Sequence, residues 1–315
     1  MATDVIATTP TAGPQTPGSE RARKRATRAA RSGRAPGEKA LVAAPSTWFV
    51  WAGMAAFLIF LLGILTSVIV DSFGKSWFST WLPEVFTPQW YAKSWERFDL
   101  THVIGVTLTV AVSVVVLSVL IGVPAAYLLA RRDFPGKKLL SLLFLLPILM
   151  PPITFGIPLA TVMYNLGLGR TIWAVILVNL VPSVPFVIMT MTPFIEQINP
   201  SIENAARMCG ASMRQVFTRV LAPLLIPGIL AAAILVLVRT VGMFELTFLV
   251  SGPQSDTLVV AIYRAMTSAG GGEARQLVSA MAVMYTMTMM IILVVALRFV
   301  NPTQLVARVK DSRED

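Results

Sequence analysis

The chain of 315 residues is too apolar for a water-soluble protein, because 55% of its residues are hydrophobic and only 13% are charged, about half the charged fraction of a typical soluble domain. Its formal net charge is +10, from 26 Lys and Arg against 16 Asp and Glu. A single cysteine, Cys209, and a single histidine, His102, exclude an intramolecular disulfide and a His/Cys metal site. We expect no metal and no cofactor.

The N-terminal segment, residues 1–45, is rich in Ala, Thr, Pro, Gly and Arg and has no hydrophobic periodicity. Such a segment buries too little apolar surface to offset the entropy of ordering, so we expect a disordered, basic cytoplasmic tail. Its basic run from Arg21 to Arg34 suits nucleic acid or anionic lipid. We interpret it as a solvated topogenic tail and expect membrane lipids, but no nucleic acid, as partners.

Six segments are long and apolar enough to cross a membrane, at roughly 48–70, 102–130, 139–164, 171–195, 222–250 and 277–299. Barrel strands would be about ten residues long with alternating polarity, so we expect transmembrane helices. The domains predicted are therefore residues 46–100, with the first transmembrane helix and an external loop, residues 101–300, with the remaining spans, and a second cytoplasmic tail at 301–315.

The distribution of Lys and Arg predicts the orientation. If both termini are cytoplasmic, 19 of the 26 basic residues lie inside, six lie outside, and Arg239 lies within a span. Cytoplasmic loops carry the excess of positive charge. The sequence thus predicts a multi-pass protein of the cell (inner or plasma) membrane with both termini inside.

A polar, amphipathic loop at 196–222 separates the fourth and fifth spans. We expect a short helix at about Ser201–Cys209, started by Asn199, Pro200 and Ser201, with Glu203 favourable near its N-terminus. Gly210 permits a bend before a second helix, Met213–Val220. Val216, Phe217 and Val220 would form one apolar stripe there, with Arg214 and Arg219 facing water or lipid headgroups. A connector this long at the membrane face suits a docking site for a partner protein.

This loop resembles the "EAA" loop of type I ATP-binding-cassette importer permeases, and the resemblance covers roughly residues 100–300. Ala205, Ala206, Gly210 and Pro223 match the pattern of that loop, and Val220 matches its aliphatic position. Two positions depart: Asn204 stands in place of Glu, with Glu203 beside it, and Ala222 stands in place of Leu. Either Glu203 supplies the missing carboxylate, or the contact depends on backbone and helix shape.

The resemblance implies an all-α permease fold with six spans, in which residues 101–300 form the permease domain. It also implies that the short helix couples to an ATPase, through Glu203, Asn204, Ala205, Ala206, Gly210 and Pro223. The expected partners are two ATP-binding-cassette ATPase subunits, a second permease that is a distinct homologue, and an external solute-binding protein. The chain itself has no phosphate-binding GxxxxGK[ST] motif, so we expect no enzyme activity of its own.

Candidate pathway residues lie in spans three to five. Prolines free backbone carbonyls inside a span, and broken helices commonly line transport routes. We therefore single out Pro151 and Pro152 in the third span and Asn179 in the fourth. Arg239 and Glu245 in the fifth are costly to bury. They lie about 120° apart on an ideal helix, so they pair only if Gly242 breaks the helix.

The stretch Ser251-Gly252-Pro253 is a turn signal and resembles the polyamine, iron and thiamine branch of these permeases. We therefore expect a polyamine-type solute, with a sugar or glycerol-phosphate-type solute as the alternative. A secondary transporter is the alternative of another class, although no inverted repeat with matching broken helices is visible. A channel lacks its repeated filter motif, and a membrane enzyme lacks its catalytic cluster.

Overall fold

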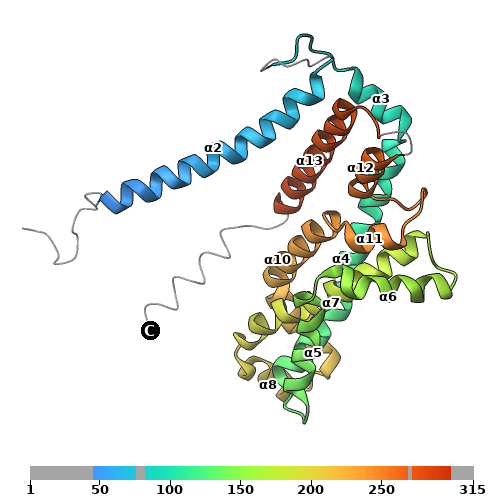
Figure 1. Cartoon of the computed structure of the whole chain (residues 1–315). Coiled ribbons are helices and arrows are strands. Elements are labelled where there is room, and N and C mark those ends of the chain that lie inside the picture. Colours follow the sequence, from blue (N-terminus) through green and yellow to red (C-terminus); the bar gives the residue numbers. More distant parts are fainter. Residues whose placement is uncertain (1–44, 76–81, 269–271, 299–315) are drawn as a thin grey trace, which may run out of the picture. The chain divides into compact units, whose positions relative to one another are not determined.

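The computed structural model describes residues 45–75, 82–268 and 272–298. The described residues fall into two units that divide between Gly63 and Ile64. Every regular element in the described part is helical (Figure 1), as the continuous apolar runs predict. The cytoplasmic tails predicted for 1–45 and 301–315 lie outside the described residues, except for Pro45 at the start of the first helix.

Long helices alternate with short ones along the chain. In order they are α2 (Pro45–Phe73), α3 (Gln89–Arg97), α4 (Leu100–Arg131), α5 (Lys137–Leu149), α6 (Pro152–Asn165), α7 (Ile172–Glu196), α8 (Pro200–Met208), α9 (Met213–Gln215), the π-helical turn η1 (Val216–Leu221), α10 (Ala222–Val241), α11 (Glu245–Val250), α12 (Leu258–Thr267) and α13 (Arg275–Arg298).

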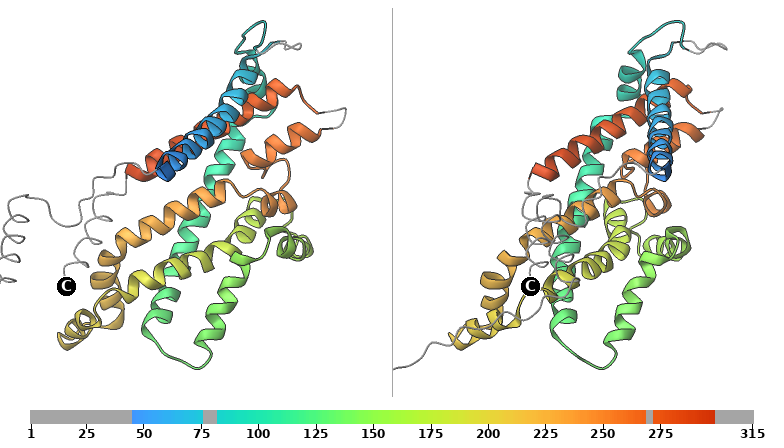
Figure 2. Two further views of the ribbon diagram at one scale, coloured as in Figure 1. Left: turned by 60° about the vertical axis from the view of Figure 1, so that its left-hand side comes forward. Right: turned by 90° about the vertical axis from the view of Figure 1, so that its left-hand side faces the viewer.

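The second unit is built around the pair α4 and α7, which make the most extensive helix contact in the described part of the chain. α10 packs against both helices, and the main core cluster draws most of its side chains from these three, with others from α6, η1 and α11. A smaller cluster joins the start of α4 to α12 and α13. Figure 2 shows α4 running from the α12 and α13 end to the α8 end, so a single helix links both clusters.

The close approach of α4 and α7 depends on a glycine. A Cβ atom at Gly122 would lie 2.7 Å from Val187 Cγ1 and 2.8 Å from Val187 Cβ, well inside ordinary carbon–carbon contact. Small residues at crossing points let transmembrane helices pack backbone to backbone. Gly122 therefore sets how tightly the two central helices associate.

Among the residues that the structure describes, five helices are long and apolar enough to cross a membrane, or up to six if one bent pair counts as a single span. That pair replaces the continuous third span expected at 139–164: α5 and α6 meet at an angle of 97°. The break has a clear cause, because Pro151 and Pro152 both lack the backbone N–H that would continue α5. Residues before proline are also driven to extended backbone, and Met150 has φ −78° and ψ 143°.

The fifth span also differs from its expected bounds of 222–250. The helical run begins earlier, at Met213, and ends earlier, at Val241. Its first turns include the wide turn η1, where the Ala222 N–H bonds the Phe217 carbonyl five residues back. At the other end Gly242 terminates α10, and the separate short helix α11 follows. Gly242 thus breaks the expected continuous span, which is the condition set above for an Arg239–Glu245 pair.

Candidate functional site: the loop between α7 and α10

Helix α8 begins where the sequence predicts. Its N-cap is Asn199, whose side-chain oxygen accepts a 2.9 Å hydrogen bond from the Ser201 N–H. Pro200 occupies the first helical position, where its missing N–H costs nothing. Glu203 lies in the first turn, as the helix dipole favours. The loop 196–222, here called the interspan loop, therefore contains a well-formed helix of its own.

The end of α8 is equally well defined. Gly210 has φ +82°, a left-handed conformation that glycine adopts without steric penalty. The Gly210 N–H bonds the Arg207 carbonyl at 2.9 Å, and the Ala211 N–H bonds the Ala206 carbonyl at 3.1 Å. These two bonds form a Schellman motif, which terminates the helix and fixes the direction of the chain. The bend predicted at Gly210 is confirmed.

The next segment starts with its own cap. The Ser212 side chain accepts from the Gln215 N–H, and the Gln215 side chain accepts from the Ser212 N–H, forming a capping box. Val216 is buried and Phe217 is half-buried, whereas Arg214 is exposed, as the amphipathic pattern predicts. In place of a separate helix ending at Val220, however, the segment passes through η1 into α10.

The two faces of α8 differ sharply. Ser201, Ala205 and Met208 recur at helical spacing on the exposed side, and Asn204 is exposed as well. Met208 is 84% exposed, an unusual state for a large apolar side chain. Ala206 is half-buried and packs against the main core cluster. We call Ser201, Asn204, Ala205 and Met208 the exposed stripe of α8.

Glu203 faces the opposite way. Its side chain is only 5% exposed and forms a 2.7 Å ion pair with Arg131 Nε at the end of α4. Tyr127 donates a 2.8 Å hydrogen bond to the other carboxylate oxygen, and its ring packs edge-on against Phe217 at 5.6 Å. The carboxylate is therefore engaged inside the chain. This pairing could not be predicted from the sequence, since neither Tyr127 nor Arg131 stands out from its neighbours.

The remaining loop position singled out from the sequence, Pro223, lies exposed in the first turn of α10. It lacks the N–H that would bond back into η1. The structure thus assembles five of the six predicted loop residues on or next to α8 and leaves Pro223 at the junction with the transmembrane helix.

The residues proposed to line the solute pathway lie at different positions in the fold. Pro151 and Pro152 form the break between α5 and α6. Asn179 is buried in α7 and donates to the Val175 carbonyl at 2.8 Å and to the Thr247 hydroxyl of α11 at 3.3 Å. It therefore ties α7 to the short helix that follows the Gly242 break, which is a packing role in this conformation.

Arg239 and Glu245 are both half-buried, and no ion pair joins them in the described part of the chain. The Arg239 guanidinium lies over the Phe186 ring of α7, with 5.7 Å between its Cζ atom and the ring centroid. Glu245 begins α11, after the break in the helix.

A second ionic cluster, built around the buried carboxylate of Asp256, follows α11 and was not predicted from the sequence. Asp256 forms a 2.7 Å ion pair with Arg264 Nε and accepts a 2.7 Å hydrogen bond from the Ser251 hydroxyl. The Ser255 hydroxyl donates to the Arg170 carbonyl at 3.0 Å, which attaches this turn to the α6–α7 connection. The turn signal at Ser251-Gly252-Pro253 thus marks an ordered connection between α11 and α12.

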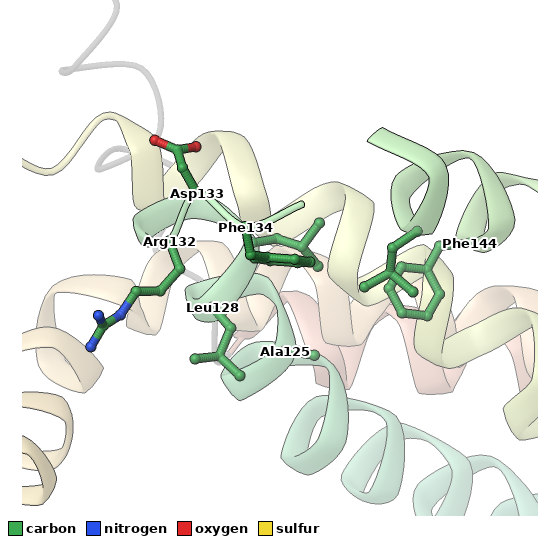
Figure 3. Close-up of a pocket in the computed structure, with 8 residues that line it drawn as sticks. Ala125, Leu128, Arg132, Asp133, Phe134 and Phe144 are labelled. Carbon is green, nitrogen blue, oxygen red and sulfur yellow. The ribbon is translucent and has the colours of Figure 1, made fainter. Parts of the chain in front are cut away.

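A cavity of about 500 Å³ lies between the end of α4 and α5. Figure 3 shows the rings of Phe134 and Phe144 facing it, whereas the charged ends of Arg132 and Asp133 point away. Binding sites for polar solutes need a few convergent polar groups. This apolar cavity supplies none, so we do not assign the solute to it.

The chain is similar in sequence to membrane components of known transport systems. Residues 118–306, more than half of the chain, match the family described as Binding-protein-dependent transport system inner membrane component. The spermidine/putrescine transport system permease protein PotC of Escherichia coli K12 is 28% identical over 258 residues, covering 82% of this chain and 93% of PotC. The molybdenum transport system permease protein ModB of Haemophilus influenzae is 30% identical over 187 residues, covering 54% and 81%.

The trehalose transport system permease protein SugB of Mycobacterium tuberculosis is 39% identical over 123 residues, which cover 39% of this chain and only 45% of SugB. Among solved structures, a bacterial ABC transporter involved in the import of the acidic polysaccharide alginate superposes with a TM-score of 0.66. The superposition covers 92% of this chain and all of the other, at 17% identity. That likeness shows a shared fold.

Proposed function

The chain belongs to the family of binding-protein-dependent transport system inner membrane components, and from that premise we propose that its interspan loop is the docking site through which a separate ATPase drives solute import. The chain is a multi-pass permease of the inner membrane, and this family membership favours an ATP-driven importer over a secondary transporter. The observation that carries the proposal is the exposed stripe of α8, presented by a helix that is capped at both ends.

The stripe has the properties of a protein-docking surface. An exposed methionine and small neighbours suit insertion into a groove on a partner, because small side chains allow close approach and Met adapts to irregular surfaces. The helix is also preorganised, since Asn199 and Gly210 fix its two ends. A preformed helix loses less entropy on docking than a flexible segment does. Asn204 and Ala205 lie in this stripe, and they are the residues we assign to the ATPase contact.

We infer six spans with both termini in the cytoplasm. The α5–α6 pair counts as one broken span in this arrangement, and α8 lies on the cytoplasmic side. The excess of Lys and Arg predicted for that side supports this orientation. Two ATPase subunits, a second permease chain and an external binding protein complete the proposed transporter. A related fold has been solved together with an alginate pentasaccharide-bound periplasmic protein, with a TM-score of 0.59 at 18% identity.

We propose a polyamine-type solute. The match to PotC extends over 93% of that protein, whereas the match to SugB covers 45% of it. A sugar is the second candidate, because the identity to SugB is higher within the matched stretch. Half-buried Glu245, at the helix break, is the carboxylate we assign to a cationic solute on the pathway.

Solute uptake into proteoliposomes, in which the orientation of the reconstituted transporter is controlled, tests this proposal. The chain is purified with the proteins that accompany it, reconstituted, and supplied with labelled spermidine or labelled trehalose, with and without ATP. The proposal expects spermidine uptake that requires ATP and persists when a protonophore collapses the proton gradient. Uptake that is independent of ATP and abolished by the protonophore would identify a secondary transporter. ATP-dependent uptake of trehalose alone would replace the polyamine by a sugar.

A further inference from the structure

Three buried polar side chains join α8 to the last turns of α4. Glu203 is 5% exposed and Arg131 is 12% exposed at their side chains, and Tyr127 is 4% exposed overall. Arg131 also donates a 2.6 Å hydrogen bond to the Ile198 carbonyl, just before α8 begins. Two residues of one helix thus hold both the carboxylate of α8 and the backbone that leads into it.

These bonds attach α8 directly to α4, in addition to the packing of α8 against η1. Glu203 is the only residue of α8 that is buried, and Ala206 is half-buried beside it. The other side chains of the helix are exposed, so little apolar area holds it in place. Charge-assisted hydrogen bonds are roughly twice as strong as neutral ones, and separating this pair would leave a buried charge without a partner.

We propose that Tyr127, Arg131 and Glu203 are positioning residues that lock α8 to α4, so that a displacement of α8 by the ATPase becomes a displacement of α4. The inference rests on the proposed function, because it takes α8 to be the docking helix. α4 is in turn packed tightly against α7 at Gly122 and Val187. A displacement of α8 is therefore transmitted to α4 and α7, the two central helices of the bundle.

This assignment gives Glu203 and Asn204 different tasks. Asn204 lies on the exposed side of α8, where a partner reaches it. Glu203 has both carboxylate oxygens bonded within the chain, one to Arg131 and one to Tyr127. Replacing Glu203 should therefore disturb the transmission of motion and leave the docking of the ATPase intact.

The variant Glu203→Gln tests this separation. It keeps the side-chain volume and removes the charge that Arg131 requires. Glu196→Gln is the matched control, because Glu196 is an exposed carboxylate at the end of α7, just before the same loop. In the reconstituted transporter, three quantities are measured: the ATPase that co-purifies, the rate of ATP hydrolysis, and the solute transported per ATP.

We expect Glu203→Gln to retain the ATPase and its hydrolysis while solute transported per ATP falls by about tenfold or more, the factor that loss of a charged hydrogen bond represents. Glu196→Gln should match the wild type. Tyr127→Phe keeps the ring against Phe217 and leaves the Arg131–Glu203 ion pair in place, so it should show a smaller loss. It is the variant to measure if Glu203→Gln does not fold. Loss of the ATPase from Glu203→Gln, or normal transport per ATP in both variants, would overturn the inference.

A distance measurement reports the locking itself. Cys209, the single cysteine of the chain, is exposed at the end of α8, and Leu128 is 54% exposed on α4. Spin labels on Cys209 and on Leu128→Cys should keep one narrow distance with and without ATP, and Glu203→Gln should broaden it. A wild-type distance that changes with ATP would contradict the locking. If the wild-type chain binds no ATPase at all, the proposed function itself fails, whatever the label distances show.

Discussion

The substitution Gly122→Ala is the most direct test of how the central helices pack. The added Cβ would lie 2.7 Å from Val187 Cγ1 and 2.8 Å from Val187 Cβ, whereas carbon atoms in contact prefer about 3.5–4.0 Å. The β-branched side chain of Val187 is stiff and fully buried, so it has no alternative rotamer into which to move. The α4 and α7 axes must therefore separate locally by roughly 1 Å.

Overpacking of this kind costs about 1–3 kcal/mol, which corresponds to a fall in Tm of roughly 2–5 °C for a chain of this size. The assay is thermal unfolding of the purified protein in one detergent. Gly105→Ala, on the same helix, is the matched control, because its added Cβ meets nothing within 4 Å. It should leave Tm unchanged or raise it slightly, since alanine favours helix.

A second substitution tests whether the clash with Val187 causes the loss of stability. Val187→Gly removes both atoms that the new Cβ would strike, so the double variant Gly122→Ala/Val187→Gly should lose less stability than the two single losses added together. Additive losses would show that the clash is not the origin of the effect. A Tm for Gly122→Ala equal to that of Gly105→Ala would refute the close packing described for α4 and α7.

Three further predictions concern the interspan loop and the α11–α12 connection. Gly210→Ala should destabilise the Schellman motif at the end of α8 by about 1 kcal/mol and reduce ATP-dependent uptake. Uptake equal to that of the wild type would show that transport does not require the left-handed conformation at Gly210. Asn199→Ala should destabilise α8 by about 1 kcal/mol, which amide hydrogen exchange detects as faster exchange in α8. Asn199→Ser, which retains a capping oxygen, should exchange like the wild type. Equal exchange rates in the two variants would show that the Asn199 side chain does not cap the helix. Asp256→Asn deprives Arg264 and Ser251 of their shared carboxylate and should lower the free energy of unfolding by about 1–3 kcal/mol. Thermal unfolding measures this loss, and an unchanged Tm would show that the carboxylate does not stabilise the fold.

The sequence predicted the elements whose causes are local. The start of α8 at Asn199 and Pro200 and the bend at Gly210 follow from the intrinsic preferences of those residues, and the structure confirms both. Helical, membrane-spanning architecture was equally predictable, because long apolar runs leave few alternatives in lipid.

Features that depend on partners distant in the chain were not predictable. The sequence showed Glu203 next to a departure from the expected pattern, and no local signal paired it with Arg131, 72 positions earlier. The Asp256–Arg264 pair spans only eight positions, but it forms across the turn between α11 and α12, whose path helical periodicity does not predict. The prolines at 151 and 152 indicated a weak point in the third span, but the size of the bend, 97°, depends on how α6 packs against α11 and α7.

The most direct test of the central claim is an affinity co-purification of the chain from its native membrane in a gentle detergent. Three forms are compared: the wild type, Ala205→Asp on the exposed stripe of α8, and Thr218→Asp, an equivalent charge at an exposed position on η1. Ala205 is preferable to Ala206, whose half-buried side chain contacts the core. We predict that a P-loop ATPase accompanies the wild type and Thr218→Asp and is lost from Ala205→Asp. An ATPase retained in full by Ala205→Asp, or absent from the wild type, would contradict the account.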